Sequence, residues 1–496
     1  MWLKDKVVNA MRSFLNIQEP TPMVYTISKI MDDQQTTYKN IIWYNGQANE
    51  LSQLYSQIPY KNDTFWGSIQ TAGLEIRKIH TGLPALIVDV LTNIIMTDYN
   101  GIDFDGKKEY EDIWTKAEEE NNFTSLLEEA VKQSLYKGRG AFKLSLDPEL
   151  SEMPIIEYFG KDKVEFVYNR GRLVELIFRT VIEEKNNKYI LKEHYGYGYI
   201  KHELLSCDEK IKYNIKDLEK TEKLTDIEFD KSFMMAIPHK VFENAIYDKK
   251  TDVFDAYDEV VSQWMNAVRD GRVRTYIPEE LIPRDKNGGF LLNPNSFDNK
   301  FIKTKGQMSE DKGNEVKVEQ PNINVDSYMN TYIATLDMCT QGIISPATLG
   351  IDSKKITDPN ATAQREKEKT TLWTRGKIVD SLNDSIPKLV KVFFFTYKTM
   401  YMKSLEKVEV QLKFGEYANP SFEAQVETVS KGKQSGIMSI EASVDELYGD
   451  SKDEEWKKEE VARLKNEQGI VEMDTIPAVN NVLNDKIGGA LDENIK

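Results

Sequence analysis

Cysteine and histidine are scarce in this chain of 496 residues, which has two cysteines and four histidines. Disulfide-bonded secreted scaffolds use many more cysteines, so we expect Cys207 and Cys339 to be reduced. No two histidines are four residues apart, and neither cysteine has a second ligand at metal-binding spacing. The sequence therefore predicts no metal site and no bound cofactor.

Long apolar runs are also missing. Residues 85–96 are interrupted by Asp89, and the phenylalanines at 393–395 are flanked by Lys391 and Lys398. Neither run approaches the roughly 20 residues that a membrane-spanning helix needs. Charged residues at positions 4–6 break any signal-peptide core near the start. We expect a soluble protein without membrane contact or targeting segment.

An excess of positive charge is absent. The chain has 65 basic and 81 acidic residues, which gives a formal net charge of −16. A protein that coats nucleic acid is expected to be basic, so the composition argues against that class. A protein that merely surrounds or guides DNA remains open, because a repulsive wall lets a polyanion slide.

Catalytic motifs are lacking as well. Gly138-Arg139-Gly140 is not followed by the Gly-Lys-Ser/Thr of a phosphate-binding loop. The glycine-containing run at residues 195–199 precedes strand-like sequence, so we interpret it as a turn or bulge. Asp103 and Asp105 lie between the turn glycines Gly101 and Gly106, so a solvated loop is favoured over a two-metal site. We therefore expect no enzyme; a hydrolase or nuclease using these two aspartates is the weakest alternative.

Helical periodicity dominates both ends of the chain and frames a β-rich middle. Helices are predicted over 81–96 and 107–137, with Asn121-Asn122 as a point of division in the second. Residues 138–240 alternate as antiparallel strands, among them 141–146, 164–168, 173–182, 188–191 and 194–204. Near the end we expect a strand over 407–414 and a helix that starts at Ser439. The predicted fold class is α+β, mainly helical.

The stretch from 325 to 401 reads as helix, loop and long helix. Its first helix ends at Ser345-Pro346, and Asp358-Pro359 offers an N-cap and first-turn proline for the second, in which Pro387 is a site for a kink. A helix is also predicted over 252–269, before short strands and turns. The two ends of the segment between these helices, residues 271–324, meet only if the helices 252–269 and 325–344 run antiparallel, as a stalk.

The long helix begins with an excess of positive charge. Residues 359–377 carry five basic and two acidic side chains in a chain of net charge −16: Arg365, Lys367, Lys369, Arg375, Lys377, Glu366 and Glu368. Together with Lys354-Lys355, this segment could approach a polyanion or an acidic neighbouring subunit. It could equally be a solvated helix face with pairs such as Glu366–Lys369. Local charge leaves both interpretations open.

This order of elements resembles the portal proteins of tailed bacteriophages of Gram-positive hosts, over most of the chain. The segments that carry the resemblance are 134–143 (SLYKGRGAFK), 255–261 (DAYDEVV), 360–363 (NATA) and 436–442 (GIMSIEA). No single motif is diagnostic, but the ordered set is specific. The tail is short, which leaves the size of the crown open.

The resemblance implies a portal fold with wing, stem, clip and crown regions, assembling as a ring, typically a homododecamer. The implied regions are the wing (1–251, with an antiparallel β region at about 138–240), stem helices (252–270 and 325–344), clip (271–324), tunnel loop (345–359), long kinked helix (360–404), crown (405–470) and a partly disordered tail (471–496).

The resemblance also implies a function: a channel at one capsid vertex through which double-stranded DNA is packaged and ejected, without sequence reading. The implied partners are the large terminase subunit and a head-completion or adaptor protein at the clip, and major capsid and scaffold proteins at the wing. The protein would be made in the host cytoplasm and reside in the virion. Channel-lining candidates are Lys354, Lys355, Arg365 and Lys367; clip-docking candidates are Tyr276, Ile277, Arg284 and Phe290. A viral scaffold or adaptor without a channel is the alternative.

Overall fold

The computed structural model describes most of the chain in two compact units. The described residues are 24–57, 64–70, 76–147, 150–184, 187–207, 209–215, 224–278, 281–282, 284, 286, 288, 301–304, 316–350, 361–401, 408–415, 422–449 and 452–467. One unit is Met1–Asp358 with Gln364–Tyr417, and the other is Pro359–Ala363 with Ala418–Lys496. Within the described residues, no helix is both long and apolar enough to cross a membrane.

The N-terminal part of the first unit is helical, as the sequence predicts. Its helices are α2 (Val24–Asn45), α3 (Ala48–Gln57), α4 (Leu83–Asp98), α5 (Lys108–Asn121) and α6 (Phe123–Tyr136). The predicted division at Asn121-Asn122 is confirmed. Asn122 has a left-handed backbone with φ of 47°, and its N–H donates to the carbonyls of Glu118 and Glu119, which ends α5.

Two antiparallel sheets follow. One has the strand order β10-β2-β3, and the other has the order β4-β5-β6-β7-β8 with β9 paired to β7. The strands are β2 (Gly140–Ser145), β3 (Ile155–Gly160), β4 (Val164–Asn169), β5 (Arg172–Glu184), β6 (Asn187–Gly196), β7 (Tyr199–Ser206), β8 (Lys212–Tyr213), β9 (Ile227–Glu228) and β10 (Ala236–His239). The predicted antiparallel β region is therefore confirmed.

One strand prediction is wrong. The expected strand over 194–204 is two strands, β6 and β7, which pair with each other from Gly196↔Tyr199 onward. Gly198 takes φ of 82° in the turn between them, a conformation that glycine adopts without steric cost. The interpretation of residues 195–199 as a strand turn is thereby confirmed.

The core of this unit joins its helices to its sheets. Trp114 packs edge-on against Phe393 at 5.4 Å between ring centroids, and against Phe123 at 5.1 Å. Between the sheets, the buried ammonium of Lys143 lies 3.0 Å from a carboxylate oxygen of Glu193 and 3.1 Å from one of Glu157. Glu157 belongs to the same sheet as Lys143 and Glu193 to the larger one, so the contact with Glu193 links the two sheets, and losing it would leave a buried charge with one partner fewer.

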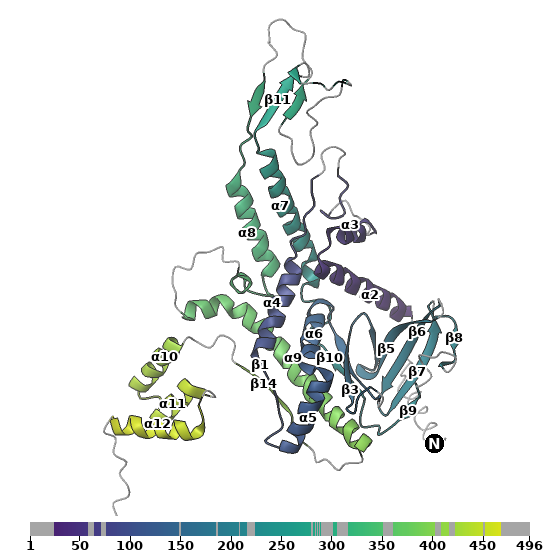
Figure 1. The fold of residues 1–496 in the computed structure, drawn as a ribbon, viewed down its shortest axis with the longest axis vertical. Coiled ribbons are helices and arrows are strands. Elements are labelled where there is room, and N and C mark those ends of the chain that lie inside the picture. The colour runs from purple at the N-terminus through teal and green to yellow at the C-terminus, as the bar shows by residue number, and fades with distance from the viewer. Residues whose placement is uncertain are drawn as a thin grey trace, which may run out of the picture. The chain divides into compact units, whose positions relative to one another are not determined.

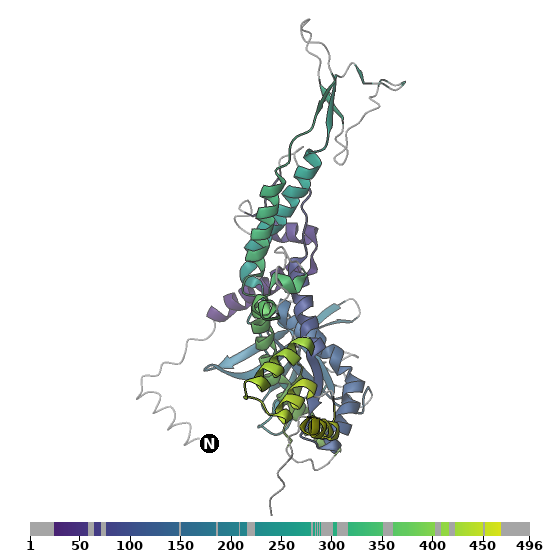
Figure 2. The same cartoon turned by 90° about the vertical axis from the view of Figure 1, so that its left-hand side faces the viewer.

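The predicted pair of antiparallel helices is present. The helices α7 (Thr251–Asp270) and α8 (Val325–Thr340) lie side by side in both views (Figures 1 and 2). Tyr257 contacts Tyr332 while Trp264 contacts Tyr328, so the contact partners run in opposite directions along the two helices. A short turn, η4 (Asp248–Lys250), leads into α7.

A small sheet follows α7 and precedes α8. Its strands are β11 (Arg274–Pro278), β12 (Phe301–Thr304) and β13 (Lys317–Glu319), in the order β12-β11-β13. The central strand β11 is parallel to β12 and antiparallel to β13. Gly271 joins α7 to this sheet at a crowded place, where a Cβ atom would lie 2.3 Å from Cδ1 of Ile323.

The long helix belongs to the first unit from Gln364 onward. It is α9 (Ala361–Tyr401), preceded by the turn η6 (Pro346–Leu349), and it contains Pro387 in its interior. The helix continues past the proline, and a kink there stays a prediction. β1 (Tyr99–Asp103) pairs antiparallel with β14 (Gln411–Phe414), which lies at the end of the strand predicted over 407–414.

In the second unit, the described residues after position 418 form three helices, α10 (Phe422–Gln434), α11 (Ile440–Tyr448) and α12 (Glu454–Glu467). The predicted start at Ser439 is confirmed, since its hydroxyl accepts a hydrogen bond from the Ala442 N–H at 3.1 Å and caps α11. Tyr448 packs edge-on against Trp456. Lys465 pairs with Glu441 and lowers the pKa of that carboxyl to about 2.

Candidate docking and channel surfaces

The contact between α7 and α8 is aromatic. The Tyr257 and Tyr332 ring centroids are 5.4 Å apart, and those of Trp264 and Tyr328 are 6.3 Å apart with nearly parallel planes. At the other end of α8, the Cys339 thiol contacts the Val253 carbonyl at 3.6 Å. All of these contacts join residues of α7 and α8, and none involves a residue of the small sheet.

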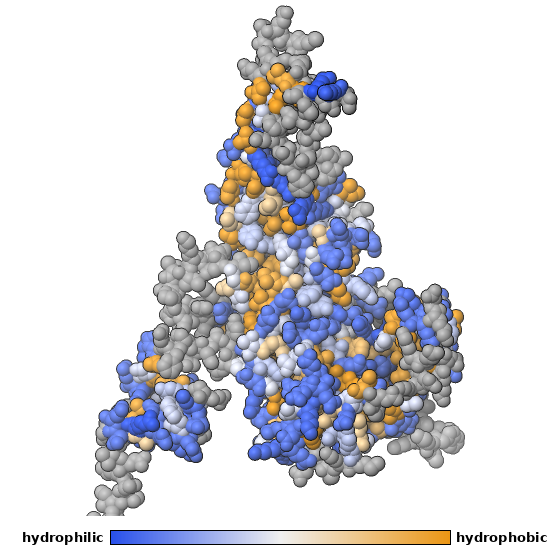
Figure 3. Space-filling view, in the orientation of Figure 1, coloured by the Kyte–Doolittle hydropathy of each residue, from blue (hydrophilic) through white to orange (hydrophobic). Residues whose placement is uncertain are grey.

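The same helices and sheet expose an apolar stripe, which we call the stem stripe. It comprises Met265, Val268, Val273, Leu281, Val316, Val318, Val325 and Met329, all of them exposed. Figure 3 shows apolar surface along the edge of the molecule over α8 and β11. Scattered apolar side chains are normal on a protein surface, but eight on α7, on α8 and on the segments between them indicate a surface that another protein covers.

The structure places three of the four clip-docking candidates. Tyr276 and Ile277 are consecutive residues of the central strand β11, both half-buried, so their side chains point to opposite faces of the sheet. Arg284 is exposed beyond the strand. Phe290 lies outside the described residues. The strand therefore divides Tyr276 and Ile277 between two faces.

The channel-lining candidates are not brought together by the described part of the structure. Lys354 and Lys355 lie outside the described residues. Arg365 and Lys367 lie in the first turns of α9, and their side chains are likewise outside the description. Their assignment stays a prediction.

Sequence reasoning missed Trp373, the most exposed aromatic side chain among the described residues on α9. It is 68% exposed, and the Lys369 ammonium lies 5.7 Å from its ring centroid. The signal was the i, i+4, i+8 spacing of Lys369, Trp373 and Lys377, which puts them on one face of the helix. Tryptophan is enriched at protein interfaces, although lysine is depleted there, so Trp373 is a candidate contact residue.

Hydroxyl groups of Thr371 and Thr374, well inside α9, fix this helix to the chain that follows α8. The Thr371 hydroxyl accepts a hydrogen bond from the Ser345 N–H at 3.0 Å and contacts the Thr348 hydroxyl at 2.8 Å. The Thr374 hydroxyl donates to the Ile343 carbonyl at 2.6 Å. The first residues of the segment predicted as the tunnel loop, Ser345 and Thr348, are therefore fixed to α9.

The two stem helices are acidic. α7 has five acidic residues and one basic residue, Arg269, while α8 has two acidic residues and no lysine or arginine. Asp255 and Asp258 are buried, and the others are available to set the surface charge. These helices therefore repel phosphate instead of gripping it.

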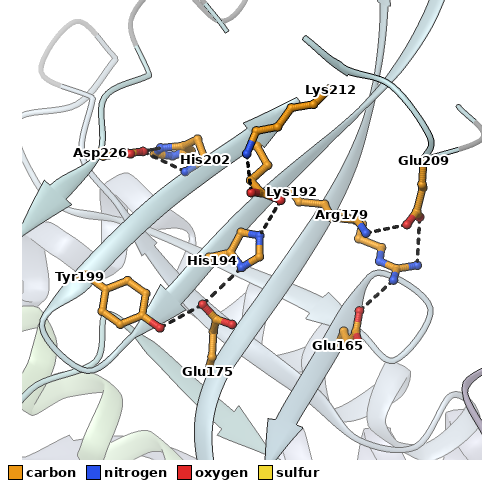
Figure 4. A network of polar contacts seen from close by, with 11 residues as sticks. Glu165, Glu175, Arg179, Lys192, His194, Tyr199, His202, Glu209, Lys212 and Asp226 are labelled. Carbon is orange, nitrogen blue, oxygen red and sulfur yellow. Dashed lines mark hydrogen bonds and ion pairs between the residues drawn. The ribbon is translucent and has the colours of Figure 1, made fainter. Parts of the chain in front are cut away.

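The larger sheet carries a network of charged side chains on one face (Figure 4). His194 lies 3.2 Å from Glu175 and 3.6 Å from Glu203, while Arg179 joins Glu165 to Glu209. Hydrogen bonding to Lys212 lowers the pKa of Glu203. Charges of opposite sign alternate between neighbouring strands and neutralise one another, as expected for a solvated sheet face.

No metal or catalytic cluster stands out in the part of the chain that is described. No group of three or more His, Cys, Asp or Glu side chains there could hold a metal ion. Asp103 lies 3.8 Å from the Lys413 ammonium, and Asp105 occupies a turn with φ of 55°. Asp105 thus lies in a turn, as the sequence favoured, whereas the expectation of a loop is wrong for Asp103, which ends β1 and pairs with Gln411 of β14.

Comparison with known proteins identifies a family. A family model described as phage portal protein, SPP1 Gp6-like, matches residues 28–469. A search of curated proteins gives no match.

Solved structures give distant matches. A chain from the virion of a native gene transfer agent particle is 12% identical with a TM-score of 0.33, over 81% of this chain and 90% of that chain. A chain from the neck of the native particle, computed with C12 symmetry, is 11% identical with a TM-score of 0.39, over 74% of this chain and 90% of that one.

Proposed function

Because the chain belongs to the SPP1 Gp6-like phage portal proteins, we propose that its copies close into a ring, a dodecamer, around a channel for double-stranded DNA. The ring would occupy one vertex of the capsid, as the connector between head and tail. Genome packaging and ejection would both pass through it.

The stem stripe is the observation that supports the ring. A cyclic ring is built from heterologous contacts, so each copy needs two different surfaces that fit one another. Eight exposed apolar residues along the stem helices and the small sheet provide one such surface. Covering apolar area contributes about 25 cal/mol per Å², so the stripe stabilises the ring once a neighbour covers it.

The acidic stem helices support a channel through which DNA slides. Their excess of carboxylates opposes tight phosphate binding, while sparse lysines, Lys354 and Lys355 among them, would supply weak contacts. Contacts to phosphate depend on salt and carry no sequence information. DNA would therefore move in either direction without regard to sequence.

The small sheet and the wing are the proposed docking regions. The sheet around β11 would take the large terminase subunit during packaging and a head-completion protein afterwards. The wing would contact capsid and scaffold proteins. The chain itself would have no enzymatic activity, and the terminase would hydrolyse ATP.

Electron microscopy of the purified full chain, with mass photometry of the same sample, tests the ring. We expect rings with a central hole for the wild type and a shift toward monomers for Met265→Ser/Val268→Ser. The matched control is Val181→Ser, which changes an exposed valine of β5 outside the stem stripe. If only monomers, dimers or filaments form, even with capsid and scaffold proteins coexpressed, the chain is a scaffold or adaptor without a channel.

A further inference from the structure

The helix α4 is held at both ends by charged side chains from distant parts of the chain. It has 16 residues, Leu83–Asp98, and is therefore about 24 Å long. Its buried side chains pack into the core between α2 and α6. Figure 1 shows it running from the base of α7 to the β1–β14 pair.

At its first end, α4 meets a carboxylate of the stem helix α7. One oxygen of Asp258 accepts hydrogen bonds from the Thr81 N–H at 3.0 Å and the Thr81 hydroxyl at 2.8 Å. The other oxygen accepts from the Trp66 indole at 3.2 Å and lies 2.6 Å from Nδ1 of His80. The Asp258 side chain is only 1% exposed, so these partners replace water completely.

The Asp258 carboxylate compensates for the lack of an N-cap side chain on α4. The helix begins after Gly82, which has no side chain to cap it. A helix N-terminus carries partial positive charge, so the buried negative charge of Asp258 stabilises it. The start of α4 therefore depends on α7.

Two further side chains of α7 extend this contact. Asp255 accepts hydrogen bonds from the Phe65 N–H at 2.7 Å and the Trp66 N–H at 3.1 Å, and the Ser262 hydroxyl accepts from the Ile79 N–H at 2.9 Å. With Asp258 they are spaced i, i+3 and i+7, which is one face of a helix. The described residues before α4 are thus fixed along the stem helix.

At its other end, α4 meets a guanidinium of α9. Nε of Arg375 lies 2.7 Å from an Asp98 carboxylate oxygen, and Nη2 donates to the Gly415 carbonyl at 2.7 Å. The Gly415 N–H in turn donates to the backbone carbonyl of Asp98 at 2.7 Å. A cation at a helix C-terminus is favourable, and both charged side chains here are largely buried.

We propose that α4 is a strut that couples the stem helix α7 to the long helix α9. A close-packed helix cannot shorten, so it transmits a displacement of one end to the other. Arg375 lies one turn from Thr371 and next to Thr374, which fix α9 to the chain after α8. In the ring, the strut would link the base of the stem helix α7 to the channel wall, a consequence that rests on the proposed function.

Hydrogen exchange of the full chain tests the strut. Asp258→Asn places an amide N–H group against partners that all donate hydrogen bonds, which weakens the contact at the start of α4. We expect at least fivefold faster exchange in α9 peptides around residues 368–378. Arg375→Gln should speed exchange at residues 76–82 in the reciprocal way, since coupling between two sites is mutual. The matched control is Glu259→Gln, the adjacent residue on α7, whose carboxylate accepts from Gln263 on the helix surface.

The double variant decides between coupling and two separate contacts. Sites this far apart normally contribute additively to stability, so a non-additive effect of Asp258→Asn and Arg375→Gln supports the strut. Exchange that changes only at the substituted end, with additive effects, overturns it. If Asp258→Asn does not fold, Arg375→Lys, which cannot make both Arg375 contacts, gives the same test, and unchanged exchange at 76–82 overturns the proposal. Each variant is compared with wild type in the same oligomeric state, assigned by mass photometry, so a failure of the portal function would be seen separately.

Discussion

Single buried polar residues join the parts of the first unit, and His239 is one whose ionisation matters. It lies fully buried on β10, with Nδ1 2.9 Å from the Ser385 hydroxyl of α9. Ser385 donates its own proton to the Ser381 carbonyl, so Nδ1 of His239 is the donor in this contact. Burial lowers the pKa of His239 to about 4, with Asp384 opposing this in part.

The depressed pKa of His239 predicts that stability falls in mild acid. Between pH 6.5 and 4 the unfolded chain takes up a proton at this residue that the folded chain refuses, so folding stability is complete above that range and declines as pH falls through it. At pH 5 this amounts to about 2 kcal/mol relative to pH 7. Urea unfolding at both pH values should show a loss larger in the wild type than in His239→Gln by this amount. An equal loss in both would show that His239 does not titrate as buried.

A glycine also joins distant parts of the first unit, by close packing and not by charge. Gly138 has φ of 95°, and a Cβ atom there would lie 2.5 Å from the Glu243 carbonyl oxygen. The Gly138-Arg139-Gly140 sequence that breaks the helical pattern after α6 is therefore a close crossing of two backbones. This close packing accounts for the glycine at position 138 without a phosphate-binding role.

At the scale of elements, the small sheet is inserted in the chain between the antiparallel helices α7 and α8. Their aromatic contacts all lie within the helices, and the Trp264–Tyr328 pair closes them near the sheet. The helices bring β11 and β13 together, and their aromatic contacts with each other involve no residue of the sheet, so we expect α7 and α8 to pack without it.

This arrangement predicts that docking and ring assembly can be separated. Deletion of residues 285–315 removes β12 and the segments beside it and leaves α7, β11, β13 and α8. We expect rings to form while terminase or adaptor binding is lost, as measured by mass photometry and by pull-down with each partner. Deletion of residues 471–496 serves as control. Retained docking would show that the clip assignment is wrong.

At the scale of the whole molecule, the proposed channel combines a repulsive wall with few cations. The acidic stem helices supply the wall, and the predicted tunnel loop, whose first residues are fixed to α9, supplies Lys354 and Lys355. Phosphate contacts of this kind weaken as salt rises.

Replacing both lysines with alanine should therefore lower DNA packaging or retention while rings still assemble. The amount of DNA per head, measured over a range of salt concentrations, checks this. Lys188→Ala/Lys201→Ala, which removes two lysines from the larger sheet, is the matched control. An unchanged amount of packaged DNA would remove Lys354 and Lys355 from the channel.

The sequence by itself determined the kinds of elements and most of their order. Helical spacing predicted α4 and α7, alternation predicted the antiparallel strands, and the length of the segment between α7 and α8 required these two helices to lie antiparallel. These patterns are local, because a residue's face on a helix or strand depends only on its position in that element. The family resemblance was also visible in this order, and the family match bears it out.

Only the tertiary structure decided which distant residues meet. The pairing of β1 with β14, the burial of Asp258 against Thr81 and the contact of Arg375 with Asp98 each join segments far apart in the chain. Nothing in the local pattern separates Asp258 from Glu259, yet one is buried with four hydrogen-bond contacts and the other lies on the surface. Burial is a property of the assembled fold, because the partners that make a buried charge tolerable come from elsewhere in the chain.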